Sequence, residues 1–164
     1  MSTPAPSEWL RALEAELTVL AKDALGLPPV HVTARGDAPP AAMEGAYLGF
    51  ISSEGAYQVG LASTPDGCQA FARGLLSSAP SDPPLSKADV ADAVCEIVNM
   101  LAGGVQRRIR QLSGLQVGLG LPTFFHGAVQ PTERLGVAVA EVRVGELPAA
   151  LLVLHPRTRS AQEN

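Results

Sequence analysis

The stretch AYLGFISSEGAYQVGLAS, residues 46–63, constrains the fold of this chain more than any other feature. Two runs rich in β-forming residues flank Ser-Ser-Glu-Gly, and Gly55 can adopt the positive φ that a tight turn requires. The pattern predicts a β-hairpin. Because strands joined by so short a turn pair antiparallel, we expect a largely antiparallel sheet.

Three other segments have the period of an amphipathic helix, with apolar residues spaced by three and four. Each begins after a residue that can cap a helix, and glycine follows the first and the third. The predicted helices are 8–25 with Ser7 as N-cap, 65–77 with Thr64 as N-cap, and 87–112 with Ser86 as N-cap and Gly114 as its stop.

Further β-type runs precede the hairpin and follow the longest helix. The predicted strands are 30–34, 115–121, 134–144 and 148–156, the last buried on both faces, and 36–45 is predicted as a loop. The order of elements predicts an α+β fold, a largely antiparallel sheet packed against a pair of long helices. We expect one domain over residues 1–164, with a core from about 7 to 156.

Composition excludes several classes of protein. The net charge of −4 and the 4% aromatic content argue against nucleic acid as a partner. Two cysteines are too few for a disulfide scaffold, and no histidine motif predicts a metal site. No apolar run is long enough to span a bilayer and the first residues do not resemble a signal peptide, so we expect a cytoplasmic protein without membrane contact.

The longest predicted helix has a polar stripe. Asp92, Glu96, Asn99 and Gly103 follow one another at steps of four, three and four, which places them on one face. Such a stripe is commonly no more than a solvated face. This one lacks basic residues at the positions that would give ion pairs, and Gly103-Gly104 removes side chains beside it. That combination favours a binding surface.

The same residues resemble a known signature, that of the CheC/CheX/FliY family of chemotaxis phosphatases. In that family an Asp or Ser, a Glu and an Asn are followed after twenty-two residues by a Pro. Asp92, Glu96, Asn99 and Pro122 fit this spacing. The resemblance covers residues 46–127 best, and the single copy of the motif is most similar to the CheX branch.

The resemblance implies a phosphatase that acts on the phosphoaspartate of a CheY-type receiver domain. It implies that Asn99 orients the attacking water and that Glu96 docks the receiver's lysine. Asp92 would support the contact, Gly103 would clear space for the partner, and Pro122 would shape the adjacent turn. Magnesium would come from the receiver, so the chain would need no cofactor of its own. CheX-like members form homodimers, and we expect one here.

Two alternatives remain open at this stage. The same helix could dock a receiver without catalysis, as a scaffold, or could belong to a flagellar-switch module like the FliM middle domain. The arginines near the helix end are interpreted as favourable charges at the negative end of its dipole. Attraction of an acidic receiver surface is the other interpretation; these residues are Arg107, Arg108 and Arg110.

Overall fold

The computed structural model describes residues 3–157, which form three helices and one seven-stranded sheet. The helices are α1 (Pro6–Asp23), α2 (Pro65–Leu75) and α3 (Lys87–Ser113). The strands are β1 (Val30–Gly36), β2 (Met43–Ser52), β3 (Gly55–Ser63), β4 (Gly118–Leu119), β5 (Thr123–Gly127), β6 (Leu135–Val144) and β7 (Leu147–Pro156).

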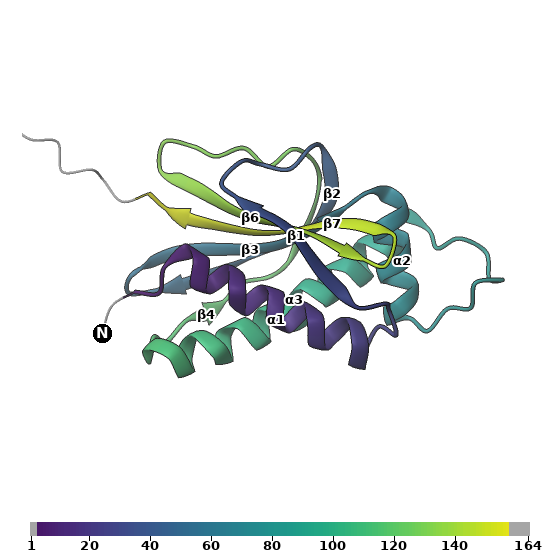
Figure 1. Ribbon diagram of the computed structural model, residues 1–164, viewed down its shortest axis with the longest axis horizontal. Helices are drawn as coiled ribbons and strands as arrows, with labels where there is room; N and C mark the ends of the chain where they lie inside the picture. Colours follow the sequence, from purple (N-terminus) through teal and green to yellow (C-terminus); the bar gives the residue numbers. More distant parts are fainter. Residues whose placement is uncertain (1–2, 158–164) are drawn as a thin grey trace, which may run out of the picture.

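Every strand pair in the sheet is antiparallel. The order is β1-β6-β7-β3-β2-β4, and β5 also pairs with β2. The helices α1 and α3 lie side by side on one face of the sheet, and α2 lies near the beginning of α3 (Figure 1). The predicted α+β class, with an antiparallel sheet and a helix pair, is therefore confirmed.

The main core lies between the sheet and the helices, and β7 shows how the sheet is buried on both sides. Leu151 and Val153 of β7 face the helices, whereas Ala150 and Leu152 belong to a second apolar cluster on the opposite face. The connection between β5 and β6 lies on that opposite side (Figure 1), and Val129 packs there. The prediction of a last strand buried on both faces is confirmed.

The turn and cap predictions are mostly confirmed. Gly55 has φ +128° in the β2–β3 turn, and Gly114 has φ +72° immediately after α3. The hydroxyl groups of Thr64 and Ser86 accept hydrogen bonds at the starts of α2 and α3. Since these turns and caps depend only on neighbouring residues, they can be predicted from the sequence.

The predicted Ser7 cap is wrong. The helix begins at Pro6, whose fixed φ and missing N–H suit the first helical position. Ala5 occupies the N-cap position, and its N–H donates to Glu8 Oε2 over 2.7 Å. The Glu8 carboxylate thus binds the N–H of the N-cap residue, and among residues 3–157 no side chain caps the N–H groups of the first turn.

The predicted strand 115–121 is also largely wrong. Only Gly118 and Leu119 form a strand beside β2, with one further hydrogen bond of 2.8 Å from the Gly120 N–H to the Gly49 carbonyl. Before them, the Gln106 side chain of α3 donates to the Val117 carbonyl over 2.7 Å and holds Val117 against the helix. The sheet resumes after Pro122 as β5, which was not predicted. Pairing with β5 also begins β2 at Met43, inside the predicted loop 36–45.

Candidate functional site

The helix α3 is fixed at both ends, and this sets which face it presents to solvent. At its beginning, the Gln69 side chain of α2 brackets Leu85, donating to its carbonyl over 3.2 Å and accepting from its N–H over 2.8 Å. At its end, Gln106 binds the chain beyond Gly114. The apolar side, including Ile97 and Leu101, is buried in the core.

The polar stripe lies on the opposite side of α3. Asp92, Glu96 and Asn99 are exposed and Gly103 is half-buried. Within residues 3–157, none of the three polar side chains has a hydrogen-bond or ion-pair partner. Glu96 and Asn99 stand about 4.5 Å apart along the helix axis, close enough to contact one ligand together. A carboxylate and a carboxamide are therefore presented together, free to bind a partner.

The two glycines beside the stripe differ in what surrounds them. A Cβ at Gly104 would collide with the Glu16 carboxylate of α1, and Glu16 Oε1 in turn accepts from Arg108 Nε over 2.6 Å. A Cβ at Gly103 would meet only Arg107 Nη1, at 3.8 Å. Gly104 thus serves the packing of α1 on α3, whereas the chain's own packing gives no reason for glycine at 103.

A hollow of about 400 Å³ lies between α1 and α3, next to the stripe. Asn99, Met100, Gly103 and Arg107 line it from α3, and Val19 lines it from α1. Sequence reasoning missed this hollow, because it depends on how α1 lies against α3. The four-residue spacing from Asn99 to Gly103 and on to Arg107 was the one available signal.

Pro122 lies away from α3 in the chain, half-buried between β4 and β5. The strand β5 lies near α3, so Pro122 immediately precedes the element next to the site helix. Within the described residues, Asp92, Glu96 and Pro122 do not line the hollow, whereas Asn99 and Gly103 do. The structure thus brings Asn99 and Gly103 into one concave surface, and Glu96 lies outside its lining, three residues before Asn99 on α3.

Burial affects the pKa of the cysteine next to the stripe. Desolvation, together with nearby Asp92, raises the pKa of the Cys95 thiol. Burial also raises the pKa of the Cys68 thiol to about 12. Because thiolates are the reactive form, neither residue is suited to nucleophilic chemistry near neutral pH.

Metal-ligand side chains do not cluster in the described part of the chain: no group of three or more His, Cys, Asp or Glu could hold an ion. Between residues 3 and 157, none of the helices is both long and apolar enough to span a bilayer.

The fold is shared with solved chemotaxis proteins. The chain is similar to CheX from Desulfovibrio desulfuricans, with TM-score 0.73 and 15% identity over 90% of this chain and 99% of that one. CheX from Vibrio vulnificus gives TM-score 0.72 and 18% identity, covering 93% and 99%. A chain of the CheX–CheY–BeF3–Mg²⁺ complex from Borrelia burgdorferi gives 0.70 and 13%, covering 96% and 100%. At these identities the likeness shows the fold.

A family model defines the class further. The model described as chemotaxis phosphatase CheX matches residues 47–139, which is more than half of the chain and includes the polar stripe and Pro122. The chain therefore belongs to the CheX family of chemotaxis phosphatases. A comparison with curated protein sequences found no match.

Proposed function

We propose that this protein hydrolyses the phosphoaspartate of a CheY-type receiver domain. The observation that supports this most is the pairing of Glu96 and Asn99 on one exposed face, with no partner in the described residues to occupy them. Family membership and the CheX–CheY complex from Borrelia burgdorferi point to the same kind of partner.

In the proposed reaction, water attacks phosphorus and the bond from phosphorus to the aspartate oxygen breaks. The aspartate leaves as a carboxylate, and the protons of water pass to the released phosphate and solvent. Asn99 orients the water, because its carboxamide oxygen accepts a hydrogen bond and its NH₂ donates one at any pH near neutral. This role needs placement of the side chain and no change in its protonation.

Glu96 docks the receiver by pairing with the lysine of the receiver's phosphorylation site. One turn earlier, Asp92 supports that contact. Gly103 leaves room for the receiver's surface, and Pro122 fixes the turn into β5. The Mg²⁺ that neutralises phosphate charge belongs to the receiver, so this chain contributes no cofactor of its own. We further propose that the protein works in the cytoplasm as a homodimer, which sedimentation should show as twice 17.0 kDa.

Phosphate release from phosphorylated receivers, with and without this protein, tests the proposal. Asn99→Ala should reduce the acceleration about 100-fold, as expected for loss of a positioning group, while the affinity for the receiver changes little. Gln111→Ala is the matched control, since Gln111 is another exposed carboxamide on α3 and lies outside the stripe.

Glu96→Ala should weaken binding of the receiver, and Glu96→Gln should separate the loss of charge from the loss of the side chain. If the wild-type protein binds a phosphorylated receiver without accelerating its dephosphorylation, the enzymatic proposal is wrong and a non-catalytic scaffold remains. If Glu96→Ala changes neither binding nor rate, the docking role of Glu96 is wrong.

A further inference from the structure

The hollow between α1 and α3 is continuous with the face that presents Asn99. Asn99 is itself part of the lining, Gly103 lies about 6 Å further along the helix axis, and Arg107 lies about 12 Å from Asn99. A partner whose phosphoryl group is within reach of Asn99 through one water has to cover this short distance as well. Any receiver that reacts at Asn99 is therefore expected to lie over the hollow.

The floor of the hollow is bare, and exposed apolar side chains line part of its walls beside the carboxylates of Glu16 and Asp23. Val19 is 47% exposed and Met100 is 37% exposed, although both are large hydrophobic residues. Between them, Gly103 offers only backbone, at a cost of about 1 kcal/mol relative to alanine in a helix. The concave space fits an apolar side chain from another protein, which would bury Val19 and Met100 on binding.

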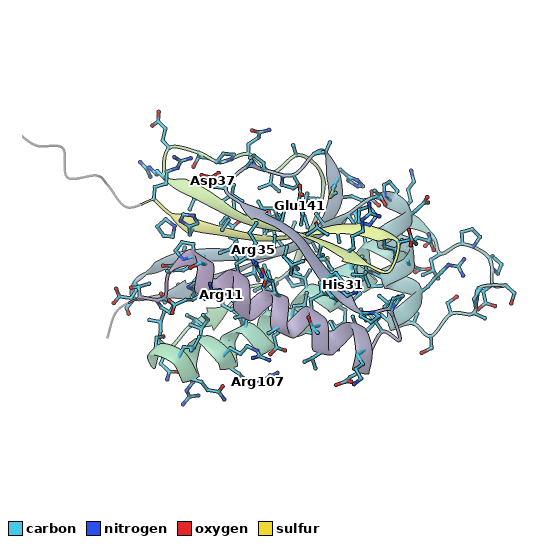
Figure 2. All side chains as sticks on the ribbon, viewed as in Figure 1. Arg11, His31, Arg35, Asp37, Arg107 and Glu141 are labelled. Atoms are coloured by element: carbon cyan, nitrogen blue, oxygen red, sulfur yellow. The ribbon has the colours of Figure 1, made fainter. Side chains whose placement is uncertain are left out.

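An arginine without an ion-pair partner in the described residues lines the far end of the hollow. Arg107 lines it and has no hydrogen-bond or ion-pair partner within residues 3–157, unlike Arg108, which binds Glu16. Asp23 lines the α1 side and lies beyond ion-pair distance of Arg107. In Figure 2, Arg107 lies on the side of the helix layer that faces away from the sheet. Its guanidinium is available to a carboxylate of a partner.

Charge is thus divided along the outer face of α3. The acidic residues Asp92 and Glu96 precede Asn99, whereas Arg107 follows it. A complementary partner presents a cation toward Glu96 and an anion toward Arg107, with its reacting group between them.

We propose that this hollow determines which receiver the protein accepts. It binds an apolar side chain of the receiver on Gly103, between Val19 and Met100, and Arg107 pairs with a receiver carboxylate beside that side chain. The proposal rests on the receiver being the partner, and it adds the residues that select it. These residues contribute to docking and take no part in the chemical step.

The test measures binding of CheY-type receivers from the source organism, loaded with Mg²⁺ and beryllofluoride, by titration calorimetry. Val19→Ser, Gly103→Leu and Arg107→Gln should each raise the Kd at least 10-fold. For Val19→Ser, the dephosphorylation rate at saturating receiver should stay within twofold of wild type, because docking alone is affected. Matched controls are Leu112→Ser and Arg110→Gln, an exposed apolar residue and an exposed arginine on α3 outside the hollow.

The inference is overturned if the three variants raise the Kd no more than the two controls do, whether or not the wild type is a phosphatase. If the wild type binds the receiver without dephosphorylating it and the three variants bind more weakly, the proposed activity is wrong and the proposed docking site stands. If Gly103→Leu changes the oligomeric state and leaves the receiver's Kd unchanged, the hollow is an interface between copies of this chain. If no receiver binds the wild type, both proposals fail.

Discussion

The adjacent glycines of α3 give a prediction that tests the geometry without any partner. Gly103→Ala should stabilise the protein by about 1 kcal/mol, because alanine is the better helix former and its Cβ meets only Arg107 Nη1, at 3.8 Å. For a chain of this length that free energy corresponds to a rise in Tm of about 2–4 °C.

Gly104→Ala should have the opposite sign. The same gain in helix propensity is offset, because the new Cβ displaces the Glu16 carboxylate from Arg108 Nε, where the hydrogen bond is 2.6 Å long. A hydrogen bond between charged groups contributes about 1.5–3 kcal/mol. Since the Arg108 side chain is 41% exposed, water replaces part of the lost interaction, and the lower value of about 1.5 kcal/mol applies. The net effect is a loss of about 0.5 kcal/mol.

Urea unfolding followed by Trp9 fluorescence measures both variants. Trp9 is the one tryptophan of the chain, is fully buried and stacks on Tyr57 with ring centroids 4.6 Å apart, so its emission reports loss of the core. In a Glu16→Ala background the collision disappears, and Gly104→Ala should then stabilise by about 1 kcal/mol. If Gly104→Ala stabilises the wild-type protein as much as Gly103→Ala does, the assignment of the two glycines is wrong.

Three further predictions concern the scaffold. Arg35→Met should lower the urea midpoint, because Glu14 is 9% exposed and loses two hydrogen bonds of 2.7 and 2.8 Å from Arg35, which lies between β1 and α1 (Figure 2). An unchanged midpoint would contradict this. Because the pKa of Cys68 is raised from 9.0 to about 12, the folded state binds the thiol proton more tightly than the unfolded state does. Its contribution to the free energy of unfolding is complete below pH 9.0 and is lost as the pH rises toward about 12. Cys68→Ala should therefore make the loss of stability at alkaline pH shallower, and an equal loss in both proteins would refute the reasoning. Gly45→Ala should destabilise the protein by about 3 kcal/mol, because the new Cβ would collide with the backbone of β3. Gly49→Ala, on the same strand, meets open space and should change the midpoint of thermal unfolding little. Equal effects of the two changes would contradict the register of β2.

How far the fold could be predicted depended on the range of the interactions that set each element. The β2–β3 hairpin and the ends of α3 were predictable, because Gly55 and Gly114 adopt positive φ for reasons local to the turn and the cap. The segment after α3 was not, because a side chain eleven residues away, Gln106, holds Val117 out of the sheet. The start of β2 likewise depends on β5, a strand from the other half of the chain.

The candidate site divides in the same way. Helical periodicity alone placed Asp92, Glu96 and Asn99 on one face, and the structure shows all three exposed. Their proposed roles stay predictions until the phosphatase assay is done. The hollow could not be predicted from the sequence. Val19 is one of many apolar residues in α1, and it lines the hollow only because α1 packs on α3. Both interpretations of the arginines, as dipole charges or as attraction for an acidic receiver surface, treat them alike, yet Arg108 binds Glu16 and Arg107 lines the hollow.

The outer face of α3 can therefore diverge without unfolding the protein. Glu16, Gly104 and Arg108 join α1 to α3 through a close approach and a hydrogen bond, so they contribute to the stability of the helix pair. Val19, Met100 and Arg107 take no part in that contact, so under the proposed docking they are free to vary with the receiver. Asn99 is the one side chain that both lines the hollow and, in the proposed function, positions water. Changes of specificity should accordingly accumulate around Asn99, while Asn99 and the Glu16–Arg108 contact stay as they are.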